Sequence, residues 1–287
     1  MIKLKKNKLN VFLLAAIPVL IFLGCKKSAE NSFVIDNDIK TPSNKDPETK
    51  TINFNRADGA YTKAQAESDF GGSILMTWQN IDISSNQARV RIPANSLSQG
   101  NIVNIDIPDG TEYELSFKIR FATNFDWSRG GKVGFGFHIG NGYTGCNKAD
   151  NGLGGTARLM WYNATGSKTN YVTTGSYFRP YVYYKDMPED CGNSFGKQSK
   201  QINTDTWYTV KIKVKSNTGS NTDGLVSYEI DGVNLLNQVL RWTTNDDYRK
   251  VKYITFHTFR GGSQEYWQAT TDGYIYYDDL VFKRIAI

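Results

Sequence analysis

The sequence is poor in the residues that metal and redox sites use most. It has two histidines, His138 and His257, and three cysteines, Cys25, Cys146 and Cys191. Zinc sites draw on clusters of histidine, cysteine and carboxylate side chains, and neither such a cluster nor a CxxC spacing occurs along the chain. We therefore expect no metal and no other cofactor.

Helical periodicity and internal repeats are also scarce. The best helix candidate is the short segment 62–70, TKAQAESDF. Apolar and polar residues alternate instead, as they do in half-buried β-strands. The segments that read in this way are 87–92, 113–121, 156–162, 181–184, 207–215, 225–231, 253–259 and 273–285. Many short strands separated by Gly, Asn, Asp and Ser clusters predict an all-β sandwich or barrel of antiparallel sheets.

The one long apolar run lies at the N-terminus. Residues 1–10 are basic, with four lysines, residues 11–24 are apolar, and Cys25 follows. The run is short for a transmembrane helix, and its order of basic and apolar regions is typical of a secretory signal. Because residues 22–25, FLGC, resemble a lipobox, we expect 1–25 to be a lipoprotein signal peptide with Cys25 lipidated. The alternative, an uncleaved anchor, also places the rest of the chain outside the cytoplasm.

The remainder divides into a tether and one domain. Residues 26–50 are polar, charged and interrupted by two prolines, so they have too little apolar surface to fold. Residues 51–287 suit a single all-β domain. We expect this domain to lie outside the cytoplasm, in the periplasm or at the outer membrane or cell surface. The N-terminal lipid would be its only contact with a membrane.

The net charge gives no support for nucleic-acid binding. The formal charge of +6 includes the four lysines of the signal, so the mature chain carries about +2. Its basic residues form short stripes rather than the clustered face of a nucleic-acid binder. Cys146 and Cys191 remain as an even pair in an oxidising compartment, and we expect a structural disulfide between them. We also expect a monomer.

Candidate functional groups lie on four of the predicted strands. They are basic, hydroxyl-bearing or aromatic, and comprise Lys132, His138, Thr156, Arg158, Tyr181, Tyr183 and His257. Arginine and lysine can neutralise a carboxylate, which stabilises the enolate-like species formed when the adjacent carbon loses its proton. Tyrosine or histidine can remove that proton or protonate a leaving oxygen. These residue types favour β-elimination in a uronic-acid polymer, and a non-catalytic carbohydrate-binding groove is the alternative.

The segment 130–140, GGKVGFGFHIG, places two glycines between charged and ionisable side chains. Lys132, Gly134, Gly136 and His138 share one face of the alternating pattern. Glycine inside a strand often marks a bulge or the close approach of a ligand. We expect the two glycines to clear the floor of a groove for a sugar ring. Glycine also lets a concave sheet bend, which is a second interpretation of the same pattern.

The order of several short motifs resembles the polysaccharide lyase family 14 domain. The matching segments cover most of residues 110–285, and they are GGKVGFGF, GGTARLMWY, YVYYKDMP, YEIDG, FHTFRGG and YIYYDDLVF. The resemblance implies a jelly-roll β-sandwich of two antiparallel sheets with a cleft on the concave face. It also implies a lyase that acts on an anionic polysaccharide, alginate or a related polyuronate.

The resemblance further implies roles for individual residues. Lys132 and Arg158 would engage the substrate carboxylate, and Thr156 stands where the family has serine. Tyr181 and Tyr183 would serve as base and acid, in an order that stays open.

The family motif can be aligned with this chain in a second way, which selects other tyrosines. The stretch between Arg158 and Tyr181 is longer than the family pattern leads us to expect. Tyr171 and Tyr184 are therefore the alternatives to the Tyr181/Tyr183 pair.

Overall fold

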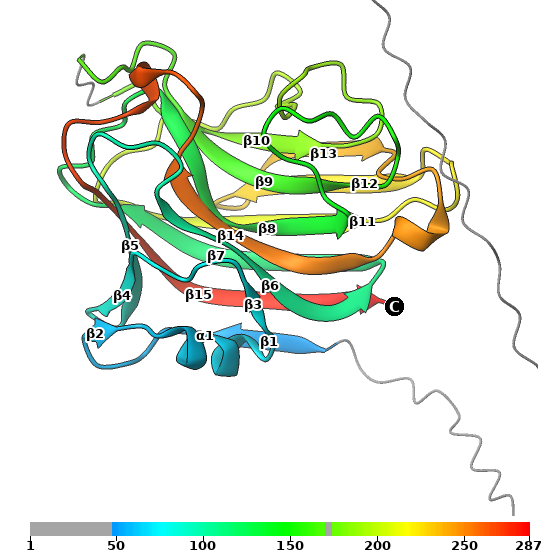
Figure 1. Cartoon of the computed structure of the whole chain (residues 1–287), viewed down its shortest axis with the longest axis horizontal. Coiled ribbons are helices and arrows are strands. Elements are labelled where there is room, and N and C mark those ends of the chain that lie inside the picture. Colours follow the sequence, from blue (N-terminus) through cyan, green and yellow to red (C-terminus); the bar gives the residue numbers. More distant parts are fainter. Residues whose placement is uncertain (1–47, 170–173) are drawn as a thin grey trace, which may run out of the picture. The chain divides into compact units, whose positions relative to one another are not determined.

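The computed structural model describes residues 48–169 and 174–287, which fold into a sandwich of two antiparallel sheets (Figure 1). The expected signal peptide, its Cys25 and nearly all of the expected tether lie outside the described residues. The first strand, β1 (Thr49–Ile52), pairs with the last strand, β15 (Gly273–Ala286). The boundary expected between residues 50 and 51 therefore falls inside β1. No helix in the described ranges is long and apolar enough to cross a membrane.

One sheet of the sandwich has nine strands. Beside β1 and β15 it contains β13 (Val233–Leu240), β12 (Gly224–Ile230), β11 (Trp207–Lys215), β7 (Glu112–Phe121), β5 (Gln87–Ile92), β4 (Ile81–Ser84) and β2 (Gly59–Ala60). Its spatial order is β13-β12-β11-β7-β15-β5-β4-β2, and β1 pairs with β15 off this path.

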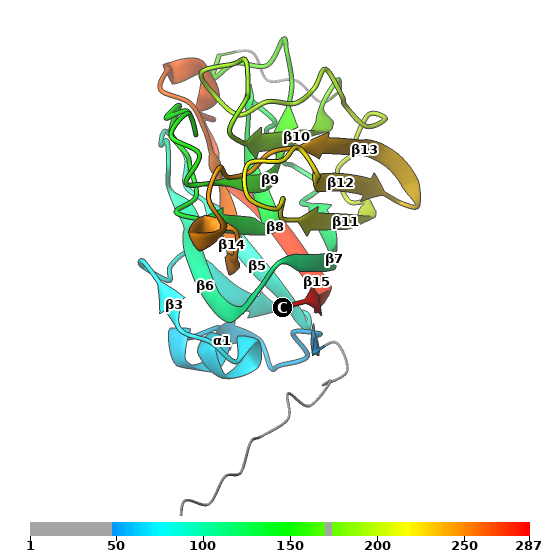
Figure 2. The same cartoon turned by 90° about the vertical axis from the view of Figure 1, so that its right-hand side faces the viewer.

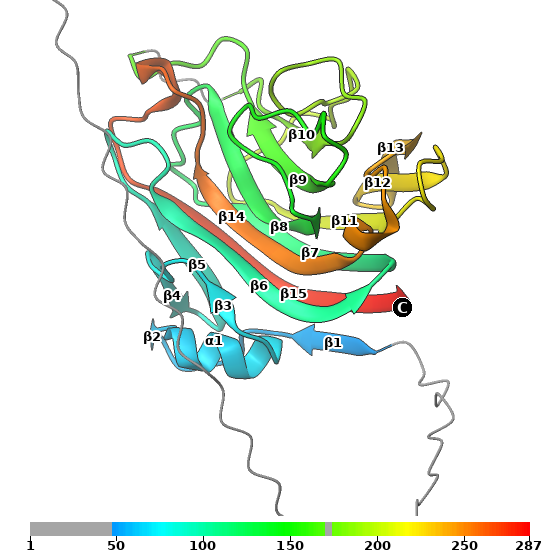
Figure 3. The same ribbon diagram turned by 45° about the vertical axis from the view of Figure 1, so that its right-hand side comes forward.

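The other sheet has six strands, and it carries the candidate site. It contains β10 (Tyr177–Tyr183), β9 (Gly154–Tyr162), β8 (Gly130–Gly140), β14 (Val251–Arg260), β6 (Gly100–Gly110) and β3 (Ile74–Leu75) in that spatial order. Its long strands bend along their length, and the nine-stranded sheet packs against them through a shared core (Figures 2 and 3). The predicted jelly-roll β-sandwich is confirmed.

The core lies between the two sheets and is rich in aromatic side chains. Phe117 of β7 packs on Phe135 of β8 with ring centroids 5.2 Å apart, and Phe135 stacks on Phe256 of β14 at 4.3 Å. Trp127 and Trp161 are fully buried at one end of the same core. Because successive strand residues point to opposite faces, burying these rings turns the intervening polar residues of β8, β9 and β14 outward.

The expected helix forms as α1 (Lys63–Phe70), one residue shorter than the segment 62–70. Thr62 is its N-cap: the Thr62 side chain accepts a hydrogen bond from the Gln65 backbone, and the Gln65 side chain accepts one from the Thr62 N–H. This reciprocal capping box satisfies two backbone donors at the start of the helix. Two short 3-10 helices, η1 (Asp246–Tyr248) and η2 (Glu265–Trp267), complete the elements.

Candidate active site

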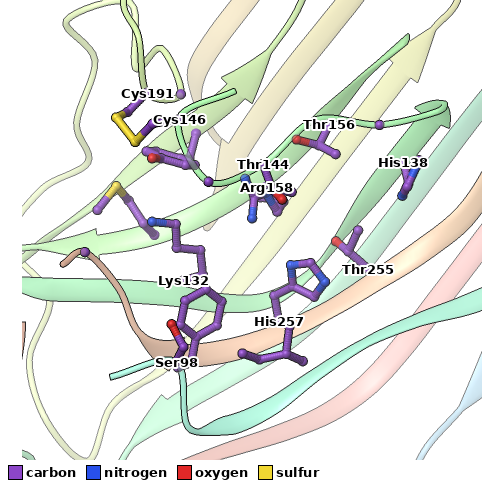
Figure 4. A pocket seen from close by; sticks show the side chains of 18 of the residues that line it. Ser98, Lys132, His138, Thr144, Cys146, Thr156, Arg158, Cys191, Thr255 and His257 are labelled. Carbon is purple, nitrogen blue, oxygen red and sulfur yellow. A yellow bond between two sulfur atoms is a disulfide. The ribbon is translucent and has the colours of Figure 1, made fainter. Parts of the chain in front are cut away.

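A groove of about 790 Å³ lies on the face of the six-stranded sheet that points away from the core. Side chains of β6, β14, β8, β9 and β10 line it, together with the segments that follow β8 and β10. The described residues along this groove include lysine, arginine and histidine, but no aspartate or glutamate. Figure 4 shows Lys132, Arg158 and His257 converging on the same space, with the Cys146–Cys191 disulfide at its rim. The groove is therefore suited to an anionic ligand.

Strand register brings the predicted residues together. Arg158 lies opposite Tyr181 in the β9–β10 ladder. Thr156 lies opposite Tyr183 on one side and His138 on the other. Because residues that are paired across a ladder point to the same face, the sheet collects these five side chains from three adjacent strands.

Arg158 is a buried cation with free hydrogen-bonding capacity. Its side chain is 4% exposed, and its Nε and Nη2 have no hydrogen-bond partner. The guanidinium lies 5.3 Å from the Tyr181 ring centroid and 5.5 Å from that of Tyr183. Within the described residues, no carboxylate forms an ion pair with it. Burial lowers the pKa of Arg158 from its usual value. A buried cation without a counter-ion is costly, so Arg158 is well placed to receive an anionic group.

Lys132 is the second buried cation of the groove. It is 8% exposed, and its Nζ lies 4.1 Å from the Tyr181 ring centroid. Burial, together with the charge of Arg158, lowers the pKa of Lys132 to about 7. Its amine can therefore be neutral near neutral pH, which an exposed lysine cannot achieve.

The two tyrosines differ in their access to the groove. Tyr181 is half-buried and lines the groove, whereas Tyr183 is fully buried and its hydroxyl accepts a 2.9 Å hydrogen bond from the Cys146 N–H. Burial and the neighbouring Tyr183 hydroxyl raise the pKa of Tyr181. The Tyr181 hydroxyl thus keeps its proton at neutral pH. The expected disulfide between Cys146 and Cys191 is present.

The two histidines occupy different parts of the groove. His257 is 6% exposed, and neither ring nitrogen has a hydrogen-bond partner. Burial, and then the charge of Arg158, holds the pKa of His257 well below its usual value, so its ring is neutral. His138 is half-buried, packs edge-on against Tyr253 at 5.1 Å, and has a pKa lowered mainly by burial. Thr156 is buried, and its hydroxyl donates to the Tyr143 carbonyl at 2.7 Å.

The two glycines of β8 do not form the floor of the groove, contrary to what the sequence pattern had led us to expect. A Cβ on Gly134, whose φ is +73°, would lie 2.6 Å from the Phe117 ring on the core side. A Cβ on Gly136 would lie 2.2 Å from the Ala157 carbonyl oxygen, so this glycine permits close approach of β9. Neither residue lines the groove. The β8–β9 register shifts around Gly134, and such a bulge bends a strand, which matches the second interpretation of the sequence pattern.

Comparison with known proteins decides the family. The family model described as Polysaccharide lyase 14 matches residues 84–280. The chain belongs to this family. The expectation drawn from the ordered motifs is thus confirmed for the family and for its lyase class.

Solved structures of alginate lyases resemble this polysaccharide lyase 14 chain. Alginate lyase Aly36B is 48% identical, with 84% of this chain and 98% of that chain covered and a TM-score of 0.78. A double mutant of Aly36B, with a lysine and a tyrosine replaced by alanine, matches equally well in complex with an alginate tetrasaccharide. The lyase from Aplysia kurodai, at 20% identity and a TM-score of 0.60 over 81% of this chain and 97% of that one, shares the fold.

A curated relative matches over a smaller part of its length. Exolysin of Paramecium bursaria Chlorella virus 1 is 32% identical over 166 residues, which are 52% of this chain and 25% of the viral protein. The chain therefore spans about a quarter of the length of that relative.

Several groove residues of this polysaccharide lyase 14 chain were not anticipated. They are polar or aromatic, and include Asn104, Arg179 and Trp267. The Asn104 Oδ1 and the Thr255 hydroxyl are buried without a hydrogen-bond partner. Arg179 could have been found from the sequence, because it precedes Tyr181 by two residues and therefore shares its face.

The alternative tyrosine Tyr184 does not line the groove. The Tyr184 hydroxyl accepts a hydrogen bond from Asn193, and its ring stacks on Phe195 at 5.5 Å. Tyr171 lies outside the described residues. Across residues 48–169 and 174–287, no group of three or more His, Cys, Asp or Glu side chains could hold a metal ion.

Proposed function

We propose that this chain cleaves a uronic-acid polysaccharide, alginate or a related polyuronate, by β-elimination. The observation that carries the proposal is the buried, unpartnered guanidinium of Arg158 in a groove without acidic residues along its described lining. The alginate oligosaccharide complexes of Aly36B support the choice of substrate, since that lyase is nearly half identical to this chain.

The first step is recognition of the substrate carboxylate by Arg158. Its free Nε and Nη2 donors match the two oxygens of a carboxylate. The neutral His257 and the Thr255 hydroxyl supply further hydrogen bonds beside it. Neutralising the carboxylate acidifies the adjacent C5–H bond, because the negative charge that develops after proton loss spreads onto the carboxylate oxygens.

The second step is removal of the C5 proton, and Lys132 fits this role better than either tyrosine. A general base works best when its pKa lies near the working pH, and burial lowers the pKa of Lys132 to about 7. Tyr181 instead has a raised pKa, and Tyr183 does not line the groove. The family resemblance implied that Lys132 engages the carboxylate and that the tyrosines transfer protons, and burial is the reason for the changed assignment.

The third step is departure of the O4 oxygen. The electron pair of the broken C5–H bond forms a C4=C5 double bond while the C4–O4 bond breaks. Tyr181, which is protonated at neutral pH, donates its proton to O4, and exchange with solvent then returns a proton to Tyr181 and removes the one held on Lys132. The products are one new chain end and one unsaturated uronate, with no water consumed.

The test is the ultraviolet absorbance of the unsaturated product on alginate, glucuronan and related polyuronates. We expect Lys132→Ala to reduce kcat by roughly 10²- to 10⁴-fold, the usual contribution of a general base. Tyr276→Phe, a tyrosine of β15 that stacks with Arg120 outside the groove, is the matched control and should retain activity. Oligouronate binding by the wild type without any product would point to the carbohydrate-binding alternative.

We also propose that the chain is exported and anchored by a lipid on Cys25. The basic and apolar segments of residues 1–25 and the disulfide of an oxidising compartment support this. In the native host, Cys25→Ser should abolish incorporation of labelled fatty acid and move the protein out of the membrane fraction. Unchanged fractionation and labelling of that variant would contradict the proposal.

A further inference from the structure

Arg179 is a third cation of the groove, and its position is set by strand register. It lies on β10 opposite Met160 of β9, and Met160 lies opposite Lys132 of β8. All three side chains line the groove. Arg179 thus belongs to the same curved face as the proposed catalytic residues, and the mechanism proposed above makes no use of it.

The guanidinium of Arg179 retains free donors. Its Nη2 donates a 2.7 Å hydrogen bond to the Ser194 hydroxyl, and its Cζ lies 4.5 Å from the Tyr162 ring centroid. In the part of the chain that the structure describes, no carboxylate forms an ion pair with Arg179. Surface arginines behave differently: Arg89 pairs with Asp82 at 2.6 Å and Arg241 with Asp186 at 2.7 Å.

Arg179 is directed away from Arg158. Along β9 the groove-facing residues follow one another as Arg158, Met160 and Tyr162, and Arg179 stacks on the last of them. Four residues along a strand span about 13 Å. The backbone of Tyr162 therefore lies about that far along β9 from Arg158, whose guanidinium lies beside Tyr181 and Tyr183. The two guanidiniums therefore stack on rings at different places along the groove, Arg158 on Tyr181 and Tyr183, and Arg179 on Tyr162.

An aromatic wall accompanies Arg179 at this end of the groove. The Tyr162 and Trp267 ring centroids are 6.2 Å apart, and both residues line the groove. The Trp267 backbone carbonyl accepts a 3.0 Å hydrogen bond from Ser128. A Cβ on Gly262 would lie 2.2 Å from the Trp267 Nε1, so the indole packs directly against the glycine backbone. The wall is held in place, and its apolar rings suit the C–H face of a sugar.

We propose that Arg179, Tyr162 and Trp267 form a second uronate-binding position, separate from the one at Arg158. This inference rests on the proposed lyase function and adds a second carboxylate-binding position to its groove. A groove with two carboxylate-binding positions selects polymers in which uronate residues are close neighbours. It disfavours polymers in which single uronates are spaced by runs of neutral sugars.

The experiment measures kcat/KM on a ladder of oligouronates of increasing length. The wild type should show a step of roughly 10- to 100-fold when the oligomer becomes long enough to reach Arg179, because a hydrogen-bonded charge pair discriminates by about that factor. Arg179→Gln should lose this step, and Arg179→Lys should recover only part of it, since lysine cannot offer a bidentate fork. The loss should appear in KM rather than in kcat.

Binding provides a second readout that does not depend on turnover. In a Lys132→Ala background, calorimetric titration with the longest oligouronate should show weaker binding for Arg179→Gln and a shallower dependence on salt. Arg120→Gln is the matched control, because it removes an arginine that stacks on Tyr276 and pairs with Asp205 outside the groove. This control should keep the full length step.

The outcomes separate the two ideas. If the wild type cleaves polyuronates and Arg179→Gln keeps both the length step and the salt dependence, the second uronate position is wrong and the lyase proposal stands. If the wild type neither cleaves nor binds any oligouronate, both are wrong. Loss of the step in Arg179→Gln, with the thermal midpoint unchanged, supports the second position.

Discussion

Lys132, the proposed general base, should destabilise the folded protein. It is 8% exposed, and burial lowers its pKa from the usual 10.5 to about 7. Each pKa unit corresponds to about 1.4 kcal/mol of preference for the neutral amine. Keeping this lysine charged in the folded state therefore costs on the order of 5 kcal/mol relative to the unfolded chain.

The sign of the effect with pH follows from the lowered pKa. Between pH 7 and 10.5 the unfolded chain holds a proton on Lys132 that the folded chain has released, so the free energy of unfolding rises with pH in this window. Below pH 7 both states are charged, and the folded state bears the whole cost. Above pH 10.5 both are neutral and the cost disappears.

Lys132→Met should therefore stabilise the protein while abolishing turnover. Methionine fills a similar volume without a charge, so the gain should approach 5 kcal/mol at pH 6.5 and shrink by pH 9.5. Urea unfolding of both proteins at several pH values measures it. Lys118→Met is the control, since Lys118 is an exposed lysine paired with Asp279 at 2.8 Å. The reasoning is refuted if Lys132→Met is less stable than the wild type at pH 6.5, or if the difference does not depend on pH.

Four further predictions follow from the same contacts. The kcat/KM should rise as the pH passes through about 7, because Lys132 of the free protein must be neutral to accept a proton, and a profile of kcat/KM that is flat across this region would contradict the assignment. Arg158→Lys should lower kcat/KM by at least tenfold in a steady-state assay, because the bidentate fork is lost. Tyr183→Phe should cost about 1 kcal/mol of stability in urea unfolding, because the part-buried hydrogen bond from the Cys146 N–H is lost. Reduction of the disulfide, whose cysteines are 45 residues apart, should cost about 4 kcal/mol, measured as the shift in urea midpoint with and without reductant.

Strands with clean alternation were predictable, and strands with a mixed face were not. In β7 the residues from Tyr113 to Phe121 alternate without error, and the core-facing ones are buried. In β6, Ile102 lines the groove beside the core residue Val103, so two apolar residues are adjacent and the period of two is lost. In β13, Leu235 and Leu236 are adjacent for a related reason: both pack on the core of the sandwich at a sheet edge.

Part of the groove lining was predictable from the sequence, whereas the roles of its residues were not. Lys132, Arg158 and Tyr181 face the groove as the sequence implied, because a period of two fixes the face of a strand residue. The sequence around Gly134 does not distinguish a β-bulge from a glycine that leaves room for a ligand in the groove. The choice of base depends on how deeply Lys132 is buried, which is a property of the packed sheets rather than of any one strand.

The disulfide at the groove rim affects when, after synthesis, the Tyr181 and Tyr183 side chains are held in position. The segment at Cys146 holds Tyr183 through its N–H, and Gly192, next to Cys191, packs so closely on Tyr181 that a Cβ there would lie 2.7 Å from its ring. The disulfide thus joins the two segments that contact the Tyr181 and Tyr183 side chains. In a chain whose cysteines are still thiols these two segments are not joined. We therefore expect the two tyrosine side chains to be held in position fully only after the disulfide has formed.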